Sequence, residues 1–145
     1  MSYYGEINNV ITRSGIDANE LYLPDEGEEV KNQQEKFEDF VEKLLIRAKS
    51  YIDLTTNNNF LESTAIVKRL ADDIAERIAV RMLSLITRDQ TNQVIEVGQF
   101  NIQLIEDVVL TDNIRKDLKI LPRGSEYTER GNIGIAIVGG DDEDA

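Results

Sequence analysis

Two long runs of this chain carry apolar residues at spacings of three and four, the period that predicts amphipathic helices. The first run predicts a helix over residues 29–54 with one buried side. Acidic residues at its start, Glu28, Glu29 and Glu35, suit the positive end of the helix dipole. The polar run 55–59 ends this helix, because short polar side chains compete for backbone hydrogen bonds. The predicted buried side consists of Phe37, Phe40, Val41, Leu44, Leu45, Ala48, Tyr51 and Ile52.

The second run predicts a central helix that begins after a cap at Asn59, paired with Glu62 as a capping box, or at Ser63. Its apolar sector is wide enough that neighbours are expected on more than one side. Its alanines allow another helix to approach closely. The sector consists of the row Ile66, Leu70, Ile74, Ile78 and Met82, flanked by Ala71, Ala75 and Ala79 and widened by Val67, Leu83, Leu85 and Ile86.

The opposite face of this helix is charged, and residues four apart predict ion pairs along it. The predicted pairs are Lys68 with Asp72, Arg69 with Asp73, and Asp73 with Arg77. The face is therefore either self-paired and solvated or a polar contact surface between subunits. Asp72, Asp73 and Glu76 form a carboxylate cluster, but the neighbouring cations compete as partners, so neither a metal nor another cofactor is predicted.

Alternating apolar and polar residues predict a β-hairpin over residues 93–105. A two-residue turn at Gly98-Gln99 pairs Val97 with Phe100 and Ile95 with Ile102. Glycine at the first turn position suits a type II′ turn, which requires a positive φ there. One face of the hairpin then carries Ile95, Val97, Phe100, Ile102 and Leu104, and a helix or another chain must cover it.

A short helix is expected next, capped by Thr111 or Asp112 and stopped by the run 122–124. Its apolar residues are Ile114, Leu118 and Leu121. Residues 132–138 then predict a strand that either completes the chain's own sheet or adds to another chain's sheet. That strand has Ile133, Ile135 and Ile137 on one face, and the acidic run Asp141, Asp142, Glu143 and Asp144 follows it.

The first 28 residues are expected to form an arm, because glycines and a proline interrupt their apolar residues. Such an arm is either disordered or ordered only against a partner. The predicted fold is mainly α with a minor β part: a small antiparallel helical bundle with one hairpin. Its parts are the N-terminal arm 1–28, the helical domain 29–124, and the C-terminal arm 125–145 with an acidic tail.

Composition restricts the function. The 145 residues contain no cysteine and no histidine, which removes disulfides, thiol nucleophiles and the commonest general base, so an enzyme is not expected. A net charge of −12 disfavours a surface that binds nucleic acid by neutralising phosphates. No apolar run approaches the roughly 20 residues of a membrane helix and no secretory signal is evident, so a soluble protein without a membrane partner is expected.

The order of these pieces resembles the head-to-tail adaptor proteins, also called connector or head completion proteins, of tailed phages and related viruses. The resemblance begins at residues 79–86 and covers the central half of the chain. It departs from the family in the long N-terminal arm, the insertion of residues 105–109 and the acidic end. The matching residues are Val97, Gly98, Phe100, Ile102, Leu110, Thr111 and Asp112.

The resemblance implies a structural virion protein of the neck, assembled in the host cytoplasm. Such proteins form a ring, usually dodecameric, between the portal protein and the next neck or tail component. The ring extends the DNA channel, and DNA passes through it without specific binding. The family's use of terminal arms to grip the portal and neighbours implies that role for residues 133–138 and for the arm before Glu28. The residues predicted to contact partners are Gly98, Phe100, Ile133, Ile135 and Ile137.

An alternative from another class is a cytoplasmic helical module for protein–protein interaction or regulation. It would bind one partner through the apolar face of residues 66–82. Low-order, closed dimers in solution would favour this alternative.

Overall fold

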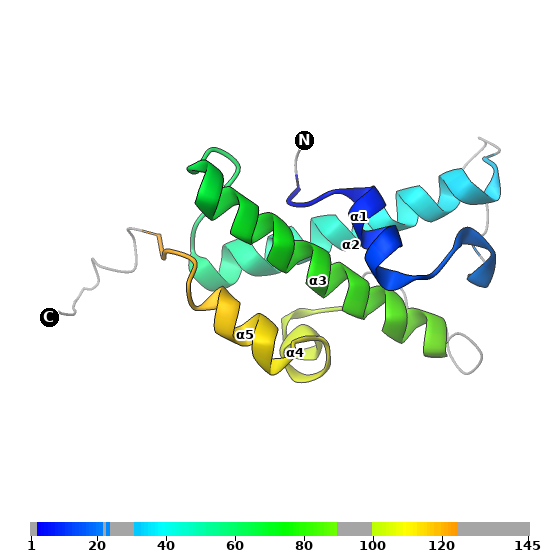
Figure 1. The fold of residues 1–145 in the computed structure, drawn as a ribbon. Helices are drawn as coiled ribbons and strands as arrows, with labels where there is room; N and C mark the ends of the chain where they lie inside the picture. Colours follow the sequence, from blue (N-terminus) through cyan, green and yellow to red (C-terminus); the bar gives the residue numbers. More distant parts are fainter. Residues whose placement is uncertain (1–2, 22, 24–30, 90–99, 125–145) are drawn as a thin grey trace, which may run out of the picture.

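The computed structural model describes residues 3–21, 23, 31–89 and 100–124. These residues form a mainly helical fold, as predicted, and contain no strand. The long helices α2 and α3 cross, and in Figure 1 α1 lies above α3 while α4 and α5 lie below it. The elements are α1 (Ile7–Ser14), the 3-10 helix η1 (Ala18–Glu20), α2 (Gln33–Thr56), α3 (Ala65–Asp89), α4 (Ile102–Leu104), the π-helix η3 (Ile105–Val109) and α5 (Asp112–Leu118).

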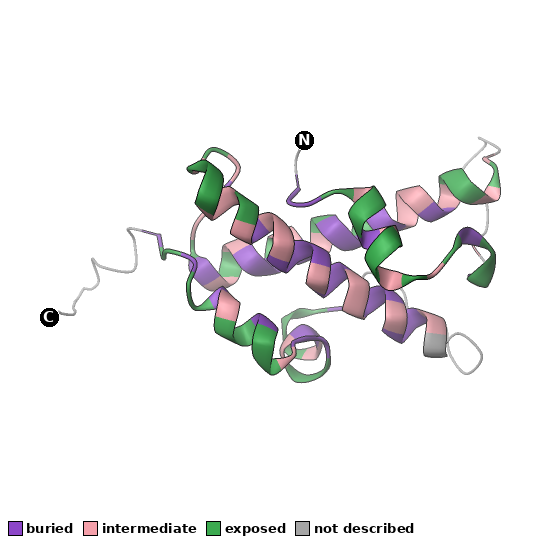
Figure 2. Cartoon of the chain, viewed as in Figure 1, coloured by how far each residue is buried: buried purple, intermediate pink, exposed green. Residues whose placement is uncertain are grey.

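Helix α2 begins four residues later than predicted, because Asn32 supplies its cap. The Asn32 side chain accepts a hydrogen bond from the Glu35 amide at 2.8 Å, and the Glu35 carboxylate accepts one from the Asn32 amide at 3.1 Å. Asn57, in the left-handed region at φ 53°, ends the helix. Glu35 lies in the first turn as predicted, whereas Glu28 and Glu29 lie outside the described residues. Apart from the half-buried Phe40, the predicted apolar side is buried, as Figure 2 shows along α2.

Helix α3 is the central helix that the sequence predicts, and it contacts α1, α2, η3 and α5. Its predicted caps are wrong. The helix begins at Ala65, the Lys68 amide donates to the Thr64 carbonyl at 2.9 Å, and the Asn59 side chain instead accepts from the Leu61 amide. The inner part of the apolar row is fully buried together with its alanines, whereas Ile66 in the first turn is 80% exposed.

The second strand of the predicted hairpin is wrong, because residues 102–109 are helical. The Asn101 side chain caps this segment by accepting a hydrogen bond from the Leu104 amide at 2.8 Å. Ile105 and Val109, four apart, are buried at 1% and 0% exposure, while Ile102 is 46% exposed. Burying Ile105 and Val109 on one side of a helix therefore outweighs the strand preference that the alternating residues 100–104 indicate. The turn and the first strand, residues 93–99, lie outside the described residues.

The last helix has the predicted cap and core. The Thr111 hydroxyl accepts a hydrogen bond from the Ile114 amide at 3.2 Å, and Ile114, Leu118 and Leu121 are buried. After the helix, the Gly124 amide donates to the Thr56 carbonyl at 2.9 Å. This bond fixes the end of the described chain beside the end of α2.

Residues 3–21, expected as part of an arm, pack against α2 and α3 of their own chain. Tyr4 and Val10 are fully buried, and Gly15 ends α1 at φ 69°. Residues 3–21 therefore belong to the core of their own chain and are neither a disordered arm nor one that is ordered only against a separate partner. The predicted C-terminal arm 125–145, with its strand over 132–138, lies outside the described residues, and the division into three parts stays a prediction.

Candidate functional site

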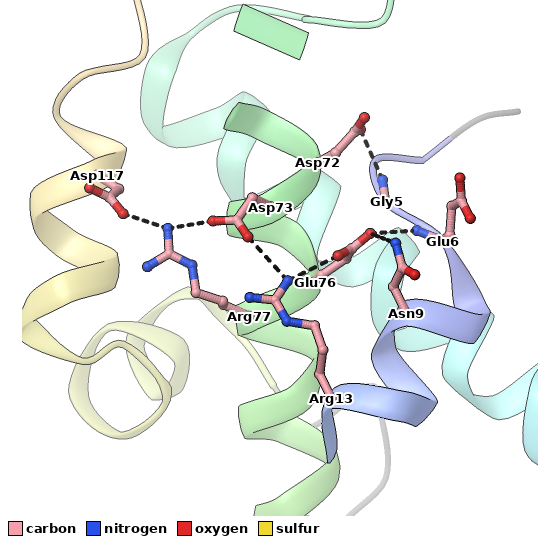
Figure 3. Close-up of polar contacts among 9 residues, drawn as sticks. All are labelled: Gly5, Glu6, Asn9, Arg13, Asp72, Asp73, Glu76, Arg77 and Asp117. Carbon is pink, nitrogen blue, oxygen red and sulfur yellow. Dashed lines mark hydrogen bonds and ion pairs between the residues drawn. The ribbon is translucent and has the colours of Figure 1, made fainter. Parts of the chain in front are cut away.

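The charged face of α3 makes contacts within the chain. Glu76 is only 6% exposed, and its Oε2 accepts hydrogen bonds from the Glu6 amide and from the Asn9 side chain, both at 3.0 Å. Its Oε1 lies 3.0 Å from Nη1 of Arg13. Figure 3 shows that these three partners all come from the α1 region. The buried carboxylate therefore fastens α1 to α3.

A second carboxylate extends this attachment. Asp72 accepts a hydrogen bond from the Gly5 amide at 2.9 Å (Figure 3). It also pairs with Lys68 at 3.2 Å. Gly5 has a φ of +86°, and a Cβ atom there would lie 2.6 Å from Cγ of Glu76. Only glycine fits this close approach of backbone to helix.

Asp73 joins both sides of α3. It pairs with Arg13 of α1 at 3.1 Å and with Arg77 at 3.0 Å, and Arg77 also binds Asp117 of α5 at 2.6 Å. The predicted pairs Lys68–Asp72 and Asp73–Arg77 are confirmed, whereas Asp73 takes Arg13 in place of Arg69. The face is therefore bound by the chain's own helices. Within the described ranges, no group of three or more His, Cys, Asp or Glu side chains is placed to hold a metal ion.

Tyr4 anchors the start of the chain at a second place. Its hydroxyl donates to Asp53 at 2.5 Å and accepts from the Phe60 amide at 2.8 Å. Lys49 pairs with the same aspartate, and its ammonium lies 5.2 Å from the Tyr4 ring centroid. Burial, followed by the hydrogen bond to Asp53, raises the pKa of the Tyr4 phenol. A general base needs a pKa near the working pH, so this tyrosine is suited to a structural role.

A shallow depression of about 400 Å³ opens beside α1 and α2. It is lined by Tyr3, Glu6, Ile7, Asn8 and Glu38. Its volume lies in the range of small-ligand sites. However, it is open to water and offers two carboxylates without a neighbouring cation in its lining, so it lacks the enclosed, convergent polar groups of a catalytic pocket.

Of the predicted contact residues, Phe100 is the one that lies among the described residues. Phe100 is 1% exposed and belongs to the core, so its side chain is not available to a partner. Gly98, Ile133, Ile135 and Ile137 lie outside the described residues. The apolar face of the alternative function is covered at Ile74, Ile78 and Met82, which are 0% exposed, whereas Ile66 at its start is 80% exposed.

An exposed surface on α5 was missed by the sequence reasoning. It consists of Arg115, Lys116, Lys119, Ile120 and Arg123, and we call it the α5 basic surface. Ile120 is 64% exposed there. The only acidic residue in the stretch 115–123, Asp117, is bound by Arg77 of α3. The sequence does contain a signal for this surface. Residues 115–123 have four basic side chains and one acidic side chain, although the whole chain has a net charge of −12.

Comparison with known proteins assigns no family to this chain. No protein-family description, no curated protein and no solved structure matches it significantly. None of the described helices is both long and apolar enough to cross a membrane. A functional proposal therefore has to be argued from the sequence and structure of this chain alone.

Proposed function

We propose that this chain is a structural virion protein, a head-to-tail adaptor that forms a ring between the portal and the next neck or tail component. The ring would extend the DNA channel without binding DNA specifically. The observation that carries the proposal is the order of the helices: the central α3, a linker, and then α5 capped at Leu110-Thr111-Asp112. This is the part of the resemblance that the observed helix boundaries support, whereas its strand element is not supported at Phe100 and Ile102.

Large apolar side chains are exposed on several elements, and they support an assembly role only where they adjoin one another. They lie on α2, at the start of α3, on α4 and η3, and after α5. Exposed apolar surface that is contiguous marks contact sites for other proteins, whereas isolated apolar residues are ordinary. The residues concerned are Ile46, Leu54, Ile66, Ile102, Val108 and Ile120.

The proposal is tested by cross-linking with mass spectrometry on native particles or on lysate that contains the protein. We expect many copies linked to each other and to a portal-like ring. A single soluble partner at low copy number would overturn the adaptor proposal. It would favour the regulatory module, which would then have to bind through a surface other than the buried residues Ile74, Ile78 and Met82.

A deletion tests the role of the predicted C-terminal arm. Removing residues 132–145 should leave the helical core folded, because Gly124 already closes it against Thr56. Docking of the ring should be lost. Circular dichroism checks the fold and electron microscopy of particles checks docking; normal assembly after the deletion would exclude this role for the strand.

A further inference from the structure

The α5 basic surface carries charges that lack partners in the described fold. Arg115 donates to the Glu106 carbonyl, but the side chains of Lys116, Lys119 and Arg123 make no hydrogen bond or ion pair with any described residue. Lys116 and Lys119 are three apart on a helical backbone that extends through Lys119, so their side chains are neighbours. Arg77 binds Asp117, and Asp112 is the other carboxylate of α5, so the four basic residues of this surface outnumber the acidic residues of the helix by two.

Hydrogen bonds also fix the position of Gly124, the last described residue of the chain. Gly124 is buried and bonded to Thr56, and the Asn58 side chain donates to the Pro122 carbonyl at 3.2 Å. Leu121 is 2% exposed. The following residues therefore start immediately next to Arg123, at the edge of the basic surface.

Those residues have the opposite charge. Residues 125–145 contain six acidic side chains and one basic side chain, a net charge of −5, and four of the acids are consecutive at 141–144. They also contain the apolar run 133–138, which matches the exposed Ile120 in character. The rest of the chain has a net charge of −7, so the basic residues gathered on the α5 basic surface, beside the point where this segment begins, are its favourable contact.

We propose that the acidic run 141–144 binds the α5 basic surface of its own chain, with the apolar run 133–138 covering Ile120. Sixteen residues lie between Gly124 and Asp141, and the seventeen Cα–Cα steps span at most about 56 Å, enough to return along α5. Tethering gives an effective concentration of about a millimolar, so the chain's own segment outcompetes free acidic partners at lower concentrations. The free chain thus covers the surface. The inference does not rest on the proposed ring function.

The test places a spin label after the acidic run of the full chain. The chain has no cysteine, so Ala145→Cys gives a single attachment point. At low salt and low protein concentration, we expect the label to reduce the amide signals of residues 116–121 and 123 about twofold or more. At 1 M salt, where the Debye length is about 3 Å, the signals should recover. Undiminished signals at low salt would overturn the proposal.

Matched variants show whether the contact is specific. Lys119→Glu should abolish the signal loss, whereas Arg69→Glu, the same charge change at an exposed position of α3, should leave it in place. Native spectra of both variants confirm that the fold is kept, and the salt series gives an independent readout. If both variants changed the signal loss equally, the effect would come from the net charge of the chain and not from the α5 basic surface, and the assigned site would be overturned.

A mixed sample separates the chain's own segment from that of a neighbour. Isotope-labelled chain without a spin label is mixed with spin-labelled chain that has no isotope. We expect no signal loss in this mixture at the low concentration used. Signal loss at residues 116–121 and 123 in the mixture would place the acidic run on a second copy and overturn the intramolecular proposal.

Discussion

Oε2 of Glu76 on α3 accepts a hydrogen bond from the backbone amide of Glu6, seventy residues earlier, at 3.0 Å. Glu6 is the N-cap residue of α1, and its own side chain makes no capping bond. A carboxylate at this position satisfies an amide at the helix start and lies at the positive end of the helix dipole. The eight-residue α1 is therefore capped by another helix of the fold.

Replacing Glu76 should weaken the attachment of α1. Glu76→Ala leaves the Glu6 amide, the Asn9 amide group and Arg13 without this carboxylate, and we expect a loss of about 2 kcal/mol in the free energy of unfolding. Urea denaturation measures the loss, and faster amide exchange over residues 7–14 locates it. Arg69→Ala, at an exposed position of the same helix, is the control and should change stability by less than about 0.5 kcal/mol. Equal losses in both variants would contradict the capping role.

Two glycines with positive φ offer a matched test of close packing. Gly15→Ala meets no atom within 4 Å, so its cost is the left-handed backbone alone, about 1 kcal/mol. Gly5→Ala has the same backbone penalty, but its Cβ also displaces Glu76 and lies 3.2 Å from the Asp72 carbonyl. We expect a loss of about 3 kcal/mol for Gly5→Ala by urea denaturation. If Gly5→Ala lowered the free energy of unfolding no more than Gly15→Ala does, the contacting atoms of α3 would be able to move aside for the added methyl group at little energetic cost.

Helix α1 explains why part of the fold was hard to predict. Its apolar spacing, Ile7, Val10 and Ile11, and its C-terminal Gly15 were present in the sequence. The run is short, however, and helices of this length are marginal in isolation. The decisive contacts, from Asp72 and Glu76, come from residues far away in the chain. The long runs of α2 and α3 needed no such information, because period alone identifies them.

The site was less predictable than the fold. The ion pairs four apart on α3 followed from spacing, but the choice of Arg13 over Arg69 by Asp73 depends on how α1 packs. Phe100 is apolar and was assigned to a contact surface, and only the tertiary structure shows it to be buried. The α5 basic surface was readable from the charges of residues 115–123, whereas the binding of Asp117 by Arg77 was not.

The buried tyrosines predict a loss of stability in alkali. Burial raises the pKa of Tyr4, and also that of Tyr3 and Tyr51, above the ordinary value of 10.0. Above about pH 10 the unfolded chain therefore loses protons that the folded chain keeps, so the free energy of unfolding falls as pH rises. One such tyrosine contributes a slope of up to about 1.4 kcal/mol per pH unit.

Tyr4→Phe isolates the contribution of Tyr4. Urea denaturation between about pH 8 and pH 11 should give a shallower fall for the variant than for the natural chain, by up to one proton. Tyr3 and Tyr51 remain and keep part of the slope. The variant should also be less stable at pH 8, because it loses the bonds to Asp53 and the Phe60 amide. Parallel curves for the two proteins would mean that Tyr4 ionises as readily in the folded state as in the unfolded state.

Ile102 and Ile105 distinguish the helix from the hairpin. In the hairpin register Ile102 lies on the buried face and Ile105 does not, whereas in the helix Ile102 is 46% exposed and Ile105 is 1% exposed. We therefore expect Ile102→Lys to change the free energy of unfolding by less than about 0.5 kcal/mol. Ile105→Lys should cost about 3 kcal/mol or more, because it removes buried apolar contacts and buries a charge.

Paired measurements by urea denaturation decide between the two arrangements, and Asn101→Ala adds a separate check. The Asn101 side chain caps the helix at the Leu104 amide, so its loss should cost about 1 kcal/mol. In the hairpin, Asn101 lies on the polar face, where truncation has little effect. A large cost for Ile102→Lys together with a neutral Asn101→Ala would restore the second strand and, with it, the strand element of the family resemblance. The reverse result leaves the resemblance dependent on the order of α3 and α5 alone.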